Sequence, residues 1–183
     1  DLYEKIIPRD YVEQRKGPFR FRFPKKEAAL LERYVPALLS EAHAVMEKRY
    51  GYTPRAPIGI EIYEAREQFA VRTGGLPQTA IAGVCFGRKL ATMSPIGSPG
   101  NLGMTLWHEL AHVFHIGLSA NRVPRWLTEG LAEWETAVRD VGWSREMDLE
   151  LHRALSADSL PSLGSMSRAF THARRMQDVA NAY

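Results

Sequence analysis

The segment HELAH, residues 108–112, places two histidines and a glutamate in a spacing that can bind a metal ion. On an α-helix, residues i and i+4 lie about 40° apart around the axis and one turn apart along it, so His108 and His112 can reach the same ion. Catalytic zinc takes three protein ligands and keeps a fourth position open for water. The metal lowers the pKa of that water to about 7, and Glu109 is placed to accept its proton. The motif therefore predicts a metal site that activates a water molecule.

The alternative for this segment is an ordinary core helix whose histidines are hydrogen-bonded. The neighbouring residues are apolar, which suits a helix packed in the interior: Leu106, Trp107, Leu110, Ala111, Val113 and Phe114. A core helix rarely buries two histidines and a glutamate side by side unless each has a partner. We therefore favour the metal site.

A second acidic segment, WLTEGLAEWE at residues 126–135, supplies Glu129, Glu133 and Glu135. Glu129 and Glu133 are four residues apart and share one face of the expected helix. By itself this pattern is typical of a solvated acidic face. Downstream of HELAH, it also offers carboxylates to the metal, and together the two segments favour that interpretation.

His115 is a rival for the third ligand, because HELAHVFH carries three histidines on one helix. Its direction lies within about 20° of that of His108, but seven residues separate the two by about 10.5 Å along the axis. Three ligands in a row on one helix also cannot make a tetrahedral site. The metzincin pattern fails as well, since it needs Gly in place of His115 and His in place of Leu118. We expect His115 to contact a ligand or to line the cleft.

The two segments resemble the gluzincin metallopeptidases, in which the third metal ligand is the Glu of a W-L-x-E-G-x-A helix. The wider pattern is similar to bacterial peptidase MA-like domains, often joined to tetratricopeptide repeats, and includes KRYGYTPRAP, IEIYEAREQFAVRTGG, AGVCFG, ATMSP, HELAHVF and RVPRWLTEGLAEWE. The resemblance implies that His108, His112 and Glu129 bind one Zn²⁺ per chain and that Glu109 is the general base. It also implies that Glu133 holds a ligand histidine by its other ring nitrogen.

This resemblance implies a zinc-dependent metallopeptidase that acts on a peptide or protein substrate, in a parent chain that can carry tetratricopeptide repeats. The Gly-x-Met-x-Asn segment with which gluzincin aminopeptidases hold a substrate N-terminus is not found before HELAH, which favours an endopeptidase. The family pattern continues beyond this chain into helices that carry an oxyanion-stabilising Tyr or His, for which the candidates here are Tyr183, His172 and Arg168. We therefore expect a domain truncated at its C-terminus, which by itself hydrolyses peptides weakly or not at all.

Two other functions stay open. A non-catalytic, zinc-stabilised interaction domain of a repeat-containing protein would keep the ligands without a complete active site. A structural domain without metal would bind no zinc at all. Zinc analysis separates the last from the other two, and a hydrolysis assay separates those two from each other.

Composition and charge exclude several classes of protein. The net charge is +3, from 24 Lys and Arg against 21 Asp and Glu, so no strong field favours nucleic acid or an anionic membrane. We interpret the basic cluster of Arg20, Arg22, Lys25 and Lys26 as a solvated face. The one cysteine, Cys85, excludes an internal disulfide, and its apolar surroundings in AIAGVCFG predict a buried thiol. No apolar run approaches the roughly 18 residues of a membrane-spanning helix.

The elements around these motifs predict an α+β fold with a zincin-like metallopeptidase lobe, in which a small mixed β-sheet packs on the HExxH helix and the C-terminal part is helical. We expect one domain over residues 1–183, with three to five strands mainly in 1–100 and the active-site and C-terminal helices in 101–183. The predicted strands are 19–24, 57–63, 80–87 and 89–95, and the predicted helices are 25–50, 64–72, 101–117 and 124–138. Pro36 should bend or split its helix. Substrate should lie extended along strand 80–87 or its hairpin partner.

Overall fold

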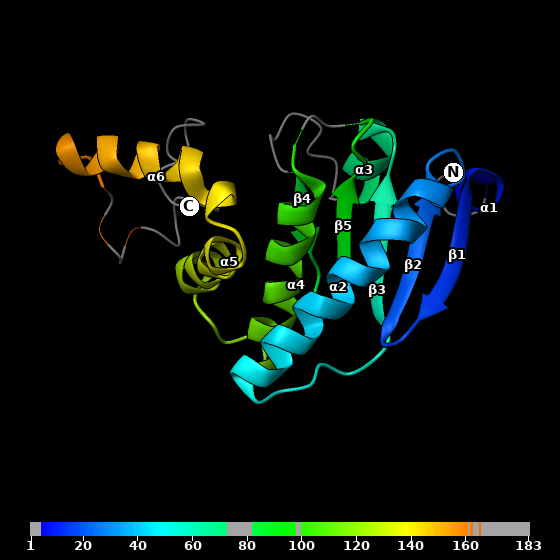
Figure 1. Cartoon of the computed structure of the whole chain (residues 1–183), viewed down its shortest axis with the longest axis horizontal. Coiled ribbons are helices and arrows are strands. Elements are labelled where there is room, and N and C mark those ends of the chain that lie inside the picture. The colour runs from blue at the N-terminus through cyan, green and yellow to red at the C-terminus, as the bar shows by residue number, and fades with distance from the viewer. Residues whose placement is uncertain (1–4, 73–81, 98–99, 161, 163–164, 166–183) are drawn as a thin grey trace.

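The computed structural model describes residues 5–72, 82–97, 100–160, 162 and 165, and for residues 145–147 the backbone alone. Figure 1 shows a sheet on one side of the molecule, helix α4 beside it, and α5 and α6 beyond α4. In chain order the elements are α1 (Ile7–Asp10), β1 (Tyr11–Lys16), β2 (Phe19–Pro24), α2 (Ala28–Tyr50), β3 (Ile58–Tyr63), α3 (Arg66–Arg72), β4 (Gly83–Cys85), β5 (Lys89–Met93), α4 (Leu102–Leu118), α5 (Arg125–Arg139) and α6 (Val141–Ser156).

The sheet has five strands in the order β1-β2-β3-β5-β4, with β2, β3 and β5 parallel and the two outer strands antiparallel to their neighbours. The predicted α+β class with a small mixed sheet is confirmed. Strand β1 was not predicted, because most of its residues are exposed or half-buried and its sequence YVEQRK lacks a clean alternation. Strand β4 lies at an edge of the sheet, where one side of its backbone has no neighbouring strand among the described residues.

Strand β2 shows why FRFRF forms a strand with two different faces. Phe19, Phe21 and Phe23 are at most 1% exposed and belong to the main core, and each such burial contributes about 1.5–3 kcal/mol to stability. Arg20 and Arg22 point to the other face, where both donate hydrogen bonds to the glutamate of the neighbouring strand, Glu13. The predicted basic face is thus paired with acidic residues of the sheet.

Helix α2 is one continuous helix, so of the two expected effects of Pro36, a bend or a split, the split does not occur. Proline has no backbone N–H and therefore cannot bond the carbonyl four residues earlier, at Glu32. The helix ends at Gly51, whose φ of 58° is the left-handed conformation that commonly ends an α-helix. Two of its large apolar side chains are not buried, since Leu30 and Tyr34 are 56% and 60% exposed.

Helix α4 is held between the sheet, α2 and α5. The Asn101 side chain caps its N-terminus by accepting a hydrogen bond of 3.1 Å from the backbone N–H of Met104. The apolar side chains predicted to pack are at most 1% exposed: Leu106, Trp107, Leu110, Ala111, Val113 and Phe114. This packing fixes the direction in which the polar residues of the helix point.

The predicted hairpin between residues 80–87 and 89–95 is present but shorter, with strands β4 and β5 joined at Gly87 and Arg88. Phe86 and Lys89 exchange backbone hydrogen bonds of 2.7 and 3.3 Å across the turn, and Gly87 has a φ of 65°. Helix α5 begins after Pro124, one residue later than predicted. None of the described helices is long and apolar enough to cross a membrane.

Candidate metal centre

Three buried side chains converge on one point between α4 and α5. The Nε2 atoms of His108 and His112 are 3.1 Å apart, and they lie 3.2 and 3.3 Å from Oε2 of Glu129. A zinc ion with ligands at 2.0–2.1 Å in tetrahedral geometry separates its ligand atoms by about 3.3–3.4 Å. The triangle therefore has the dimensions that a tetrahedral ion requires. Within the described residues, this is the one group of histidine, cysteine and acidic side chains that could hold a metal ion.

The charges of the triangle also favour a bound cation. Burial raises the pKa of Glu129, but the neighbouring imidazoles of His108 and His112 lower it by more, to well below its ordinary value. Burial lowers the pKa of His108, whereas its bonds to Glu129 and Glu133 raise it to about 10. The carboxylate thus stays ionised and attracts positive charge to the centre of the triangle.

The outer nitrogens of both histidines are held by side chains of α5. Nδ1 of His108 lies 3.0 Å from Oε1 of Glu133, and Nδ1 of His112 lies 2.8 Å from the hydroxyl of Thr128. These contacts orient each ring so that Nε2 faces the triangle. The sequence placed Glu133 in this position by resemblance, but it missed Thr128, because a threonine beside a ligand carries no signal of its own.

Replacing Glu133 tests whether this contact supports the ligand. We expect Glu133→Ala to weaken zinc binding by about ten- to a hundredfold, the usual loss when a partner of a ligand histidine is removed. Glu133→Gln is the matched control, because its amide oxygen can still accept the Nδ1 proton, and it should lose less than Glu133→Ala. Competition with a chelator of known affinity measures both. Equal affinity of Glu133→Ala and the wild type would show that the contact is dispensable.

Glu109 faces the same region but does not belong to the triangle. It is 6% exposed, and burial raises its pKa although the neighbouring histidines oppose this. A carboxylate with a raised pKa can accept a proton and release it again.

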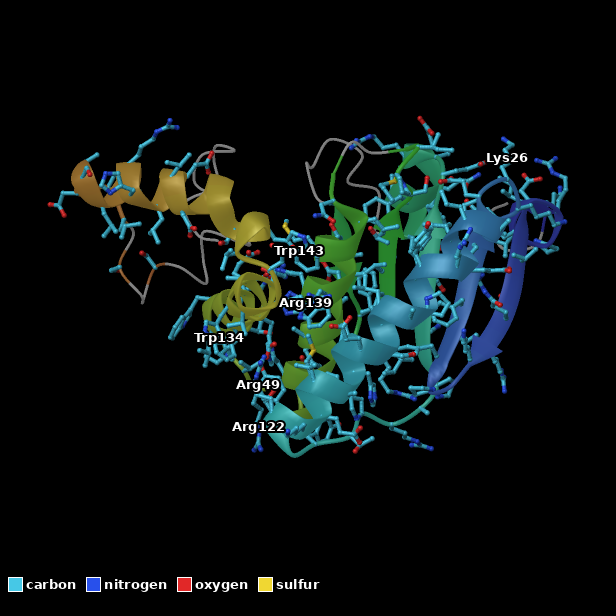
Figure 2. All side chains as sticks on the ribbon, in the orientation of Figure 1. Lys26, Arg49, Arg122, Trp134, Arg139 and Trp143 are labelled. Atoms are coloured by element: carbon cyan, nitrogen blue, oxygen red, sulfur yellow. The ribbon has the colours of Figure 1, made fainter. Side chains whose placement is uncertain are left out.

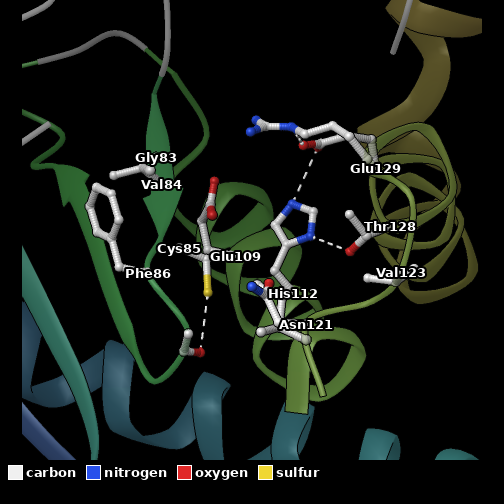
Figure 3. A pocket seen from close by; sticks show the side chains of 13 residues that line it. Gly83, Val84, Cys85, Phe86, Glu109, His112, Asn121, Val123, Thr128 and Glu129 are labelled. Atoms are coloured by element: carbon white, nitrogen blue, oxygen red, sulfur yellow. Dashed lines mark hydrogen bonds and ion pairs between the residues drawn. The ribbon is translucent and has the colours of Figure 1, made fainter. Parts of the chain in front are cut away.

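A cleft of about 370 Å³ opens beside these residues, with the edge strand β4 on one side and the start of α5 on the other. Figure 3 shows Glu109 and His112 rising from α4 into this space, with Gly83 to Phe86 facing them and Glu129 and Thr128 on the far side. The strand predicted to bind substrate, 80–87, therefore contributes β4 to the wall of the cleft.

Gly83 of β4 lies so close to Glu109 that a side chain does not fit. A Cβ atom at this position would lie 2.8 Å from both Cγ and Oε1 of Glu109 and 2.6 Å from Cγ2 of Thr105. We expect Gly83→Ala to displace the Glu109 carboxylate, and so to reduce hydrolysis at least about tenfold while zinc stays bound. Activity, zinc content and melting temperature of the variant are the measurements. Wild-type activity in a fully folded variant would contradict this role of Gly83.

His115 lies outside the triangle. Its Nδ1 is 3.2 Å from the Thr128 hydroxyl, and its Nε2 is 2.9 Å from the hydroxyl of Tyr50. Burial and the charges of His112 and His108 lower the pKa of His115 to about 4, so its ring is neutral at pH 7. His115 therefore contacts Thr128, the partner of His112.

Cys85 lines the cleft, and its thiol lies 3.5 Å from the carbonyl oxygen of Gly87. Burial and the nearby charge of Glu109 raise the pKa of Cys85, so the thiol stays protonated, in accord with a structural rather than a nucleophilic role.

The oxyanion candidates Tyr183, His172 and Arg168 lie outside the described residues. No protein-family model, curated protein or solved structure matches this chain.

Proposed function

We propose that this chain is a zinc metallopeptidase of the gluzincin type, with a zincin-like lobe that binds one Zn²⁺ through His108, His112 and Glu129. The triangle of ligand atoms, with sides of 3.1–3.3 Å, is the observation that carries the proposal. Two imidazole nitrogens and one carboxylate oxygen form a ligand set typical of catalytic zinc. The single carboxylate leaves a net positive charge on the centre, which suits a Lewis acid.

The residues around the centre support hydrolysis rather than structural metal binding. Zinc would polarise a scissile carbonyl and lower the pKa of a water molecule. Glu109 accepts the proton of that water and then delivers it to the leaving amine. A purely structural site would instead be closed by a fourth protein ligand. Here the triangle has three ligands and borders an open cleft.

The edge strand supports an extended peptide as substrate. Strand β4 is paired with β5 on one side only among the described residues, so its other side can add hydrogen bonds to a peptide backbone. Its position across the cleft from Thr128 and Glu129 brings such a peptide beside Glu109. Backbone recognition of this kind does not need a free N-terminus, which favours endopeptidase action on a protein or long peptide.

Hydrolysis of an unfolded protein tests this proposal. The chain, supplied with zinc, should cleave a substrate such as reduced and alkylated casein, and a chelator should stop the cleavage. Added zinc should restore it. Absence of cleavage by the zinc-loaded chain and by a longer parent protein would overturn the peptidase proposal.

A zinc-stabilised interaction domain is the second candidate, and an apolar groove favours it. The groove has a volume of about 380 Å³ and lies between α2 and the start of α4, lined among others by Leu30, Tyr34, Leu38 and Leu102. Leu30 and Tyr34 are more than half exposed, as surfaces that bind partners often are. In a repeat-containing parent, tetratricopeptide repeats could occupy it. Zinc binding without hydrolysis would favour this candidate.

A further inference from the structure

One chain of hydrogen bonds runs from the ligand His112 to the end of α2. The hydroxyl of Thr128 lies 2.8 Å from Nδ1 of His112 and 3.2 Å from Nδ1 of His115. Nε2 of His115 lies 2.9 Å from the Tyr50 hydroxyl, which lies 2.7 Å from Oε1 of Glu135. Three helices build this chain, since α2 supplies Tyr50, α4 both histidines, and α5 the threonine and the glutamate.

The far end of the chain is a buried anion. Glu135 is 0% exposed, and its other carboxylate oxygen forms an ion pair with Arg49, which also lies over the ring of Trp134. Figure 2 shows Arg49 and Trp134 beside each other where the end of α2 meets α5. An ion-paired carboxylate only accepts hydrogen bonds. The Tyr50 hydroxyl must therefore donate its proton to Glu135.

Counting protons fixes the direction of every other bond in the chain. There are four contacts, and four protons are available when both histidines are neutral: one each from Tyr50, His115, Thr128 and His112. Because Tyr50 donates to Glu135, it must accept from Nε2–H of His115. Nδ1 of His115 then accepts from Thr128, and Thr128 accepts from Nδ1–H of His112. The reverse direction would leave the buried carboxylate without the tyrosine proton, and buried acceptors without a donor are costly.

We propose that Tyr50, His115, Thr128 and Glu135 are positioning residues that fix the tautomer of His112, so that Nε2 keeps its lone pair for the metal. The inference rests on the proposed metal centre, which it extends to side chains beyond the ligands. The ionised carboxylate of Glu135 sets the direction of the four hydrogen bonds, and through them it sets the position of the proton on His112. His112 is thereby prepared for metal binding before the ion arrives.

The rest of the site agrees with this direction. With the proton on Nδ1, Nε2 of His112 is an acceptor for the Nε2 proton of His108, which lies 3.1 Å away and also reaches Oε2 of Glu129 at 3.2 Å. Burial and the bond to Glu135 raise the pKa of Tyr50, so its hydroxyl keeps the proton that it donates. Thr128 and Glu135 are seven residues apart, which places them two turns apart on the same face of α5.

Nuclear magnetic resonance can read the tautomers directly. Long-range correlations between ring protons and ¹⁵N nuclei, in the ¹⁵N-labelled metal-free protein near pH 7, should show His115 as the Nε2–H tautomer and a proton on Nδ1 of His112. The opposite tautomer of His115 would overturn the proposal, because Tyr50 would then have to donate to the histidine instead of to Glu135. This measurement needs no variant and no activity.

Variants that remove one hydroxyl from this chain of hydrogen bonds test its effect on zinc binding. Tyr50→Phe keeps the ring that packs against His115 and Phe114 but removes the hydroxyl, and Thr128→Val replaces the hydroxyl by a methyl group of similar size. Each should weaken zinc binding by about ten- to a hundredfold. Thr128→Ser, which restores the hydroxyl, should recover most of the affinity, and Tyr50→Phe should shift His115 toward the Nδ1–H tautomer.

The outcomes separate this inference from the proposed function. If the wild-type protein binds no zinc, the proposed metal centre is wrong. The tautomers in the metal-free protein still show whether the hydrogen bonds run in the proposed direction. If zinc binds and Tyr50→Phe keeps both the wild-type zinc affinity and the wild-type tautomers, the chain of hydrogen bonds has no positioning role. Should Thr128→Val fail to fold, Tyr50→Phe supplies the decisive comparison.

Discussion

Replacing Glu109 with glutamine is expected to remove peptide hydrolysis while the zinc content stays at the wild-type value. Glutamine fills the same space, but its amide cannot accept the proton of the attacking water. General-base catalysis typically contributes about 10²–10⁴-fold to a rate, and a loss of this size is expected here. Zinc should stay because Glu109 is not one of the three groups that converge on the metal position.

The Glu109→Gln experiment has a natural control in Glu32→Gln. Glu32 lies on the exposed face of α2, so the same chemical change there should leave hydrolysis unaffected. Zinc content and cleavage of an unfolded protein are measured on both variants. Near wild-type turnover in Glu109→Gln would mean that another group is the base.

Replacing Glu129 with alanine should weaken zinc binding more than any change in a partner of the histidines. The substitution removes one of three ligand atoms and the carboxylate that holds both imidazoles, so the loss should exceed the roughly ten- to hundredfold effect of losing a ligand's partner. His115→Ala should fall within that smaller range, because His115 contacts Thr128 rather than the centre.

Chelator competition on Glu129→Ala and His115→Ala gives the ranking, and thermal melting of the metal-free variants shows whether each is folded. Glu129→Gln is a further comparison, because it keeps the side-chain volume but replaces the charged oxygen by a weaker, neutral one. If His115→Ala lost more zinc affinity than Glu129→Ala, the third ligand would have been assigned wrongly.

The sequence predicts those parts of the candidate site that depend on helix geometry alone. The period of an α-helix puts His108 and His112 one turn apart whatever the rest of the fold does, and the apolar residues between them require a buried helix. The spacing of Glu129 and Glu133 on α5 likewise places both on the side that faces α4. The roles of these side chains remain proposals, but their convergence is a finding.

Other features depended on contacts between distant segments and could not be predicted. Tyr50 contacts His115 only because the last turn of α2 packs beside α4. Nothing in the segment KRY predicts a hydrogen bond to a residue 65 positions away. Strand β1 exists because it pairs with β2, although its own sequence has little strand character. Pro36 stays inside a helix because tertiary packing of α2 outweighs the lost hydrogen bond.

Elemental analysis of the purified chain after supply of zinc tests the central claim most directly. Three converging ligands should hold the ion through purification, so the account predicts about one zinc per chain, removed by a strong chelator and regained afterwards. Substitution of Glu129 should lower this value, whereas Glu109→Gln should not. A zinc content near zero in the folded, zinc-supplied wild-type chain would contradict the metal centre and the peptidase function proposed on it.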